Sequence, residues 1–240
     1  MPIIKLATPL KYSHPKGTPV TVVDRYIDPN TKKETWFTAP KIVGVYYKKS
    51  IEFFNKALEL RTRVFASRGP VNPKDSEQGT AFMDEQAVFD FFTEACSGII
   101  LLFGAVESLV NELIEKAPAI PYTEEKRAKI ISLGKLSVYW RRQKSLSSQE
   151  LSYKEIDLKL KYILPSLYSF ESPAQKSFWG DFKLLKRLRD SVTHPTKSRA
   201  YGASKNMNSI YAEFFGVDFQ QLVNGTGDLI KYLQISAISS

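Results

Sequence analysis

Residues 81–116 form the longest stretch of this chain in which apolar side chains recur at helical spacing. The recurring positions are Phe82, Phe89, Phe92, Cys96, Ile99, Phe103, Val106, Val110 and Leu113. Their spacing is close to the period of about 3.6 residues of an amphipathic helix, and Pro118 follows where that helix would end. A long helix with one apolar face buries that face against other helices, so the stretch predicts a helical bundle.

Five other segments carry helical patterns. They cover residues 45–66, 123–143, 153–168, 173–193 and 210–233, the last interrupted near Gly216 and Gly225. Thr123 and Ser172 are suitable N-caps for the helices that follow them, and Pro173 suits a first helical position. The stretches between the helices, several of them rich in glycine and proline, predict loops. The chain is therefore expected to be all-α over residues 44–240.

Residues 1–43 differ from the rest because prolines recur throughout them and prevent a helix. Two runs rich in β-branched and aromatic residues, Val20–Ile27 and Glu34–Ala39, are separated by the turn-forming sequence DPNTKK. This pattern predicts a β-hairpin within an N-terminal strand-and-loop arm. Packing and oligomerisation are both open as roles for the arm.

The composition excludes several classes of protein. A chain of 240 residues with 43% hydrophobic side chains buries a full core, which excludes a disordered chain. The N-terminus lacks the pattern of a signal peptide, and the longest apolar run, residues 98–106, is too short to span a bilayer. Cys96 is the only cysteine, which excludes an internal disulfide and fits a reducing compartment. We therefore expect a soluble cytoplasmic protein with no membrane partner.

The formal charge of +9 and the pI near 9.4 favour a polyanionic partner such as nucleic acid. One cysteine and two histidines argue against a zinc site built from these residues. The sequence also lacks the glycine-rich phosphate-binding motifs and the nucleophile elbow of α/β-hydrolases. We expect no metal ion and no cofactor.

An arginine stands near the end of the predicted helix 173–193 where an apolar side chain is expected. On a helical wheel Arg189 falls within about 40° of an apolar stripe. That stripe consists of Phe178, Phe182, Leu185 and Val192. An unpaired buried guanidinium is costly, so Arg189 needs a carboxylate, a phosphate or a hydrated cleft. His194 precedes Pro195, which ends the helix and leaves the imidazole about 7 to 8 Å along the axis from Arg189.

Two polar residues, Glu107 and Asn111, lie at the edge of the apolar face of helix 81–116. Polar side chains in such positions need hydrogen-bond partners. We therefore predict that Glu107 lies within hydrogen-bonding or one-water reach of Arg189. The alternative is that Glu107 points outward beside Glu112 and Glu115, as charged residues usually do.

The spacing from Arg189 to His194, with the polar Asp190 directly after the arginine, resembles the R-x4-6-H motif of the HEPN superfamily. The sequence FGAVESLVNELI, which contains Glu107 and Asn111, is similar to the family's earlier helix. The resemblance covers about residues 45–235 and leaves the arm outside. It implies a HEPN-like helical bundle that acts as a homodimer, with the motifs of two protomers facing each other.

The same resemblance implies a metal-independent endoribonuclease. Arg189 would bind the scissile phosphate and His194 would act as general acid or base, chemistry that a guanidinium fork and an imidazole supply near neutral pH. Asp190 would orient or tune the histidine, and Ser191 or Thr193 would add a hydrogen bond. Attack by the RNA 2′-hydroxyl would leave a 2′,3′-cyclic phosphate and a 5′-hydroxyl. A role in defence or in a toxin system, with an antitoxin or regulatory protein as a partner, is implied as well.

RNA contacts are predicted at basic residues near the motif or interleaved with aromatic residues: Lys186, Lys197, Arg199, Arg141 and Arg142. Solvated surface positions are the alternative for these cations. Two other functions stay open. One is a non-catalytic HEPN-like module for dimerisation or for binding RNA or a protein, and the other is an oligomeric scaffold in which protomers exchange the arm.

Overall fold

The computed structural model describes residues 3–5, 19–21, 23–38, 40–70, 80–82, 84–117, 151–194 and 210–238. This part of the chain is predominantly helical, in agreement with the predicted all-α class. By its internal contacts the chain divides into two units, residues 1–45 and residues 46–240. The predicted helix 123–143 lies outside the described residues.

The smaller unit contains two pairs of antiparallel strands. Strand β1 (Ile3–Lys5) pairs with β2 (Pro19–Thr21), and β3 (Val23–Ile27) pairs with β4 (Glu34–Thr38). The second pair is a hairpin at the predicted place, but its first strand starts at Val23 because the preceding residues pair with β1 instead. In the turn, the Asp28 carboxylate accepts hydrogen bonds from the backbone N–H groups of Asn30 and Thr31, at 2.8 and 3.2 Å.

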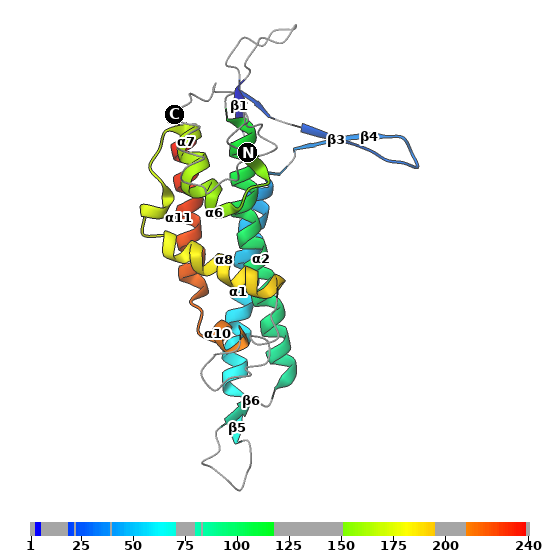
Figure 1. The fold of residues 1–240 in the computed structure, drawn as a ribbon. Coiled ribbons are helices and arrows are strands. Elements are labelled where there is room, and N and C mark those ends of the chain that lie inside the picture. The colour runs from blue at the N-terminus through cyan, green and yellow to red at the C-terminus, as the bar shows by residue number, and fades with distance from the viewer. Residues whose placement is uncertain are drawn as a thin grey trace. The chain divides into compact units, whose positions relative to one another are not determined.

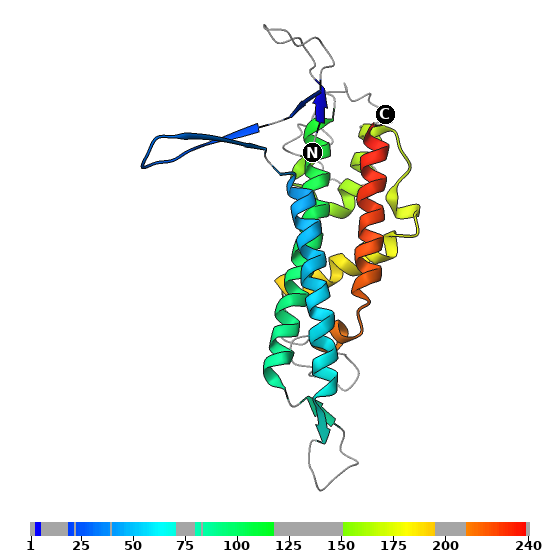
Figure 2. The same cartoon turned by 180° about the vertical axis from the view of Figure 1, so that it is seen from behind.

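Helices make up most of the larger unit. In chain order these are α1 (Ile42–Ala66), which begins in the smaller unit, α2 (Glu85–Lys116), α6 (Ile156–Leu158), the π-helical turn η1 (Lys159–Ile163), α7 (Leu164–Tyr168), the 3-10 turn η2 (Pro173–Gln175), α8 (Trp179–Thr193), α10 (Ile210–Phe215) and α11 (Phe219–Ile238). Helices α1, α2 and α11 run alongside one another, and α8 crosses α2 and α11 (Figure 1, Figure 2). Arg189 and His194 therefore lie at the end of a helix that crosses the bundle.

Helix α2 begins at Glu85, later than predicted. Residues 80–82 form strand β6 (Thr80–Phe82), which pairs with β5 (Arg68–Pro70), so Phe82 belongs to a strand and not to the helical stripe. Asp84 is the N-cap, and its carboxylate accepts a hydrogen bond from the backbone N–H of Ala87 at 2.9 Å. The strand pairing and the cap together fix the start of α2, because they satisfy backbone groups that an earlier start would use.

The buried face of α2 is also rotated from the predicted one. Phe91 and Leu102 are fully buried, whereas Phe89, predicted to face the core, is 67% exposed. The Phe54 ring of α1 packs directly on the backbone of Gly98, where an added Cβ would lie 2.6 Å from the ring. The glycine thus brings α1 onto a side of α2 that the apolar spacing alone did not single out.

Two further helix boundaries differ from the predictions. Ser172 caps the short turn η2 and not α8, which begins at Trp179 after an extended Lys176. Gly216 does separate α10 from α11, but Gly225 lies inside α11 without a break. An added Cβ at Gly225 would lie 2.1 Å from the Asp181 carboxylate, so this glycine admits the close approach of α8 to α11.

The π-helical turn precedes a proline. The backbone N–H of Leu164 bonds to the carbonyl of Lys159, five residues back. Pro165 has no N–H and its ring clashes with a regular helical carbonyl, which is the reason that the helix widens at this point. As a result Lys159 lies at the start of the widened turn and is only 2% exposed.

Among the described helices, α2 alone has the length and apolar composition to cross a membrane. Its most apolar window of 18 residues has a mean hydropathy of 1.6, and 44% of that window is buried inside the protein. The uninterrupted apolar run at residues 98–106 is shorter than this window, because the window also includes isolated charged residues. Core helices of soluble proteins share this composition, so it is weak support for a membrane span.

Candidate functional site

Arg189 lies at the edge of the core and not at its centre. The buried side chains of α8 are Trp179, Phe182, Leu185, Leu188 and Ser191. Because this set steps by three residues, its direction turns by about 60° at each step along the helix. At the C-terminal end the core face has turned toward Leu188 and Ser191, and the Arg189 side chain keeps 24% of its surface exposed.

The Arg189 guanidinium has two contacts that satisfy it in part. Its central carbon lies 3.9 Å from the centroid of the Phe103 ring of α2, and its Nη1 atom lies 2.9 Å from Asp190 Oδ1. Its Nε atom is buried and has no hydrogen-bond partner among the described residues. Stacking on an aromatic face leaves the edge of the guanidinium for hydrogen bonds, so the ring orients the arginine without using its donors.

His194 ends helix α8 as predicted. It is the C-cap residue, with φ −132° and ψ 64°, and its backbone N–H donates to the Asp190 carbonyl at 2.9 Å. The side chain is exposed. The imidazole makes no hydrogen bond or ion pair with the residues that the structure describes.

The polar residues between Arg189 and His194 serve the helix or the arginine. The Ser191 hydroxyl donates to the Arg187 carbonyl at 2.9 Å, and the Thr193 hydroxyl donates to the Arg189 carbonyl at 3.0 Å. The Asp190 carboxylate binds Arg189 and forms no ion pair with His194. The predicted orientation of the histidine by Asp190 is therefore not formed in this state of the chain.

Of the two forms in which Glu107 was predicted to reach Arg189, the direct hydrogen bond is not formed, and contact through one water stays a prediction. Glu107 is exposed, and no ion pair joins it to Arg189 in the described structure. Asn111 accepts a hydrogen bond from Lys159 Nζ at 2.8 Å, and the Ser152 carbonyl accepts another from the same ammonium. The polar edge of α2 thus serves Lys159, which the sequence reasoning had missed.

Burial lowers the pKa of Lys159, and the nearby Glu107 carboxylate offsets part of that effect. The signal that singled out Arg189 was also present at Lys159. On a helical wheel Lys159 falls within about 60° of the apolar side chains Ile156 and Ile163. A cation in or beside an apolar stripe therefore marks both positions, but the sequence does not say which partner each cation meets.

The predicted RNA-binding cations have mixed outcomes. Lys186 Nζ donates to Asp157 Oδ2 at 3.0 Å, so this ammonium is engaged inside the protein. Arg141, Arg142, Lys197 and Arg199 lie outside the described residues. Arg187 of α8 forms an ion pair with Glu213 of α10, which ties these two helices together.

Other features of the described structure offer less chemistry. Burial raises the pKa of the Cys96 thiol to about 11, which makes it a poor nucleophile near neutral pH. Within the described ranges no three His, Cys, Asp or Glu side chains gather as metal ligands.

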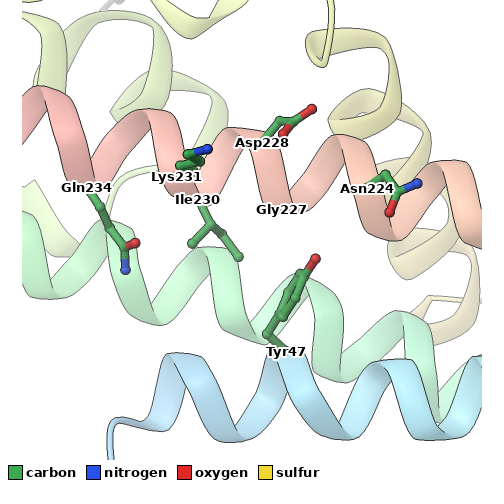
Figure 3. Close-up of a pocket in the computed structure, with 7 residues that line it drawn as sticks. All are labelled: Tyr47, Asn224, Gly227, Asp228, Ile230, Lys231 and Gln234. Atoms are coloured by element: carbon green, nitrogen blue, oxygen red, sulfur yellow. The ribbon is translucent and has the colours of Figure 1, made fainter. Parts of the chain in front are cut away.

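A groove of about 550 Å³ lies between α1 and α11, where Tyr47 points toward Gly227 (Figure 3). Its lining consists of Tyr47, Asn224, Gly227, Asp228, Ile230, Lys231 and Gln234. The Tyr47 hydroxyl donates to the Val223 carbonyl at 3.2 Å, and Asn224 accepts from Gln220 at 3.1 Å. Two polar groups of the groove are thus partnered within the protein, and none of the predicted site residues lines it.

Comparisons of the chain with protein families, with curated proteins and with solved structures find no match. None of these comparisons identifies the HEPN superfamily, so that resemblance stays a prediction from the sequence motif.

Proposed function

We propose that this protein is a metal-independent endoribonuclease with a HEPN-like helical domain, in which Arg189 and His194 carry the chemistry. The observation that supports this proposal most is the environment of the Arg189 guanidinium. Its guanidinium is held against the Phe103 ring beside the core, is partly exposed, and leads along the same helix to an exposed histidine.

The two side chains suit cleavage by the RNA 2′-hydroxyl. A guanidinium offers a planar fork of donors to phosphate oxygens and stabilises the charge that grows on the phosphorane. An imidazole takes a proton from the 2′-hydroxyl and returns one to the leaving 5′-oxygen near neutral pH. A metal ion is not needed in this mechanism, because the arginine supplies the positive charge.

A homodimer with a composite site is part of the proposal. A single protomer has one His194 at the C-terminal end of α8, and the reaction needs both a proton acceptor and a proton donor. A second protomer that approaches this helix end would bring a second histidine and a second arginine to the same phosphate. The proposal also includes a cytoplasmic role in defence or in a toxin system, with an antitoxin as a further partner. The strand-and-loop arm is outside the HEPN-like domain in this proposal.

The test is cleavage of unstructured RNA in EDTA by the wild type and by His194→Ala and Arg189→Ala. Two controls match these changes: His14→Ala alters the only other histidine, and Arg187→Ala removes an arginine from the same helix that pairs with Glu213. We expect cleavage by the wild type and both controls, with 2′,3′-cyclic phosphate ends, and none by the two site variants. Cleavage that stops in EDTA, or that survives in His194→Ala, would contradict the proposal.

A second candidate function is a non-catalytic module that binds RNA or a protein. The pairing of Asp190 with Arg189 favours it, because a carboxylate then occupies part of the guanidinium that the phosphate would use. A wild type that binds RNA or a partner but leaves every RNA intact in the same experiment would select this function.

A further inference from the structure

A cluster of partly exposed aromatic side chains lies on α2 and α10. Phe89 is 67% exposed and Tyr211 is 49% exposed. Both adjoin Phe92: Phe89 lies one turn before it on α2, and the Tyr211 ring centroid lies 4.9 Å from the Phe92 centroid. Phe215 closes the cluster, with its centroid 5.2 Å from that of Phe92. We call Phe89, Phe92, Tyr211 and Phe215 the aromatic platform.

The platform lies on the same face of α2 as the arginine. Phe92 and Phe103 point within about 20° of each other on the helical wheel and are about 16 Å apart along the axis. Arg189 stacks on Phe103, and the ion pair of Arg187 with Glu213 ties α8 to α10, which carries Tyr211. The exposed rings and the guanidinium therefore lie along one side of α2.

This combination fits unpaired nucleobases. An exposed phenylalanine has an unfavourable contact with water that a flat apolar partner removes, and bases offer such faces only where RNA is single-stranded. The platform also has positive charge beside it, because the Arg68 guanidinium lies 4.2 Å from the centroid of the Phe65 ring, itself 5.5 Å from that of Phe215. Rings that stack bases next to cations that hold phosphates are the common design of single-strand binding sites.

We propose that Phe89 and Tyr211 stack unpaired bases of a single-stranded RNA whose backbone is held at Arg189. The inference rests on the proposed function and adds to it a substrate class and a base-binding surface remote from the reacting phosphate. The distance between the aromatic platform and Arg189 leaves room for several nucleotides between the stacked bases and the phosphate at the guanidinium.

The experiment compares ring replacements that keep or remove aromaticity, in the His194→Ala background so that RNA stays intact. Phe89→Leu and Tyr211→Leu remove a ring, whereas Phe89→Tyr and Tyr211→Phe keep one. Ile235→Ala, at a 54% exposed position of α11, is the control for loss of an exposed apolar side chain. Binding of an unstructured RNA and of a hairpin duplex of equal length is measured by fluorescence anisotropy across a range of salt concentrations.

Each leucine variant should bind the single strand about ten-fold more weakly, while the aromatic variants and Ile235→Ala stay within about two-fold of their parent. The salt dependence should not change, because stacking releases no counterions, and duplex binding should be unaffected. Equal affinity of parent and leucine variants for the single strand would overturn the inference and leave the proposed function standing.

Three other results have distinct meanings. A parent protein that binds no RNA, together with a wild type that cleaves none, refutes the proposed function itself. Equal weakening of duplex binding by the leucine variants overturns single-strand recognition. Leucine variants that bind RNA normally but change the sedimentation of the protein show that the platform is a protein interface, which also overturns the inference.

Discussion

Two cations approach α2 from neighbouring helices, and they are held in opposite ways. Lys159 is 2% exposed, and its ammonium donates to the Asn111 side chain and the Ser152 carbonyl. Arg189 keeps a quarter of its side chain exposed, lies over an aromatic ring and leaves its Nε without a partner in the described residues. One cation is satisfied inside the protein, and the other is positioned but only partly satisfied.

The difference separates a structural role from a functional one. A compact ammonium whose donors meet fixed acceptors joins segments together, and its partners lose their hydrogen bonds if it is removed. A guanidinium at the edge of the core with unpaired donors can form further hydrogen bonds with a ligand, and these favour binding of that ligand. Four experiments test this comparison.

The largest expected effect is on catalysis. Arg189→Ala should lower the cleavage rate about 100- to 1,000-fold, because it removes the donors that meet the phosphate in the transition state. Lys159→Met, assayed well below its melting temperature, should keep cleavage within a few-fold of the wild type. Initial rates on a fluorogenic RNA decide this, with Arg187→Ala as the matched control. A loss of activity in Lys159→Met as large as that in Arg189→Ala would remove the distinction.

The reverse order is expected for stability. Lys159→Met should lower the free energy of unfolding by about 1 to 3 kcal/mol, since two part-buried acceptors lose the hydrogen bond from this ammonium. Arg189→Met should change it by less than about 1 kcal/mol, because its ion pair with Asp190 is partly exposed and the methionine still covers Phe103. Urea unfolding monitored by circular dichroism measures both. Equal losses in the two variants would show that Arg189 is also a structural cation.

Alkaline pH gives a smaller effect that isolates Lys159. Its pKa is lowered from 10.5, mainly by burial, so the unfolded chain binds more protons in the window just below 10.5. Stability contributed by this residue therefore rises with pH as the pH approaches 10.5 from below. The difference in unfolding free energy between wild type and Lys159→Met should grow accordingly. Burial raises the pKa values of Tyr47 and Tyr168, so these two tyrosines lower the stability as the pH rises. Both the wild type and Lys159→Met contain them, so their effect cancels in the difference. A difference that shrinks with pH would contradict the buried ammonium.

The smallest effect concerns Asp190. Asp190→Asn should raise the affinity of Arg189 for RNA by up to about five-fold, because the partly exposed ion pair that competes with phosphate is lost. Competition anisotropy with unlabelled RNA measures it in the His194→Ala background. The role implied by the family resemblance, in which Asp190 orients the histidine, instead predicts unchanged affinity and a lower cleavage rate for Asp190→Asn with His194 intact.

Hydrophobic periodicity predicted the helices well and their ends less well. The stripe of residues 81–116 identified α2 because apolar spacing reports burial directly. Its true start depends on Asp84 and on the pairing of Thr80–Phe82 with Arg68–Pro70, which joins residues far apart in sequence. Gly225 was taken for a break because glycine weakens an isolated helix, whereas here it admits the Asp181 side chain.

For the candidate site, the sequence alone determined which residues are out of place: a cation within the apolar stripe of α8 and a histidine fixed at the helix end by Pro195. Only the tertiary structure decided what those residues meet. Arg189 stacks on Phe103 and binds Asp190, while Asn111 turns to Lys159 and Glu107 to solvent. The physical reason is that periodicity fixes the direction of a side chain on its own helix, but the crossing of α8 over α2 fixes its neighbours.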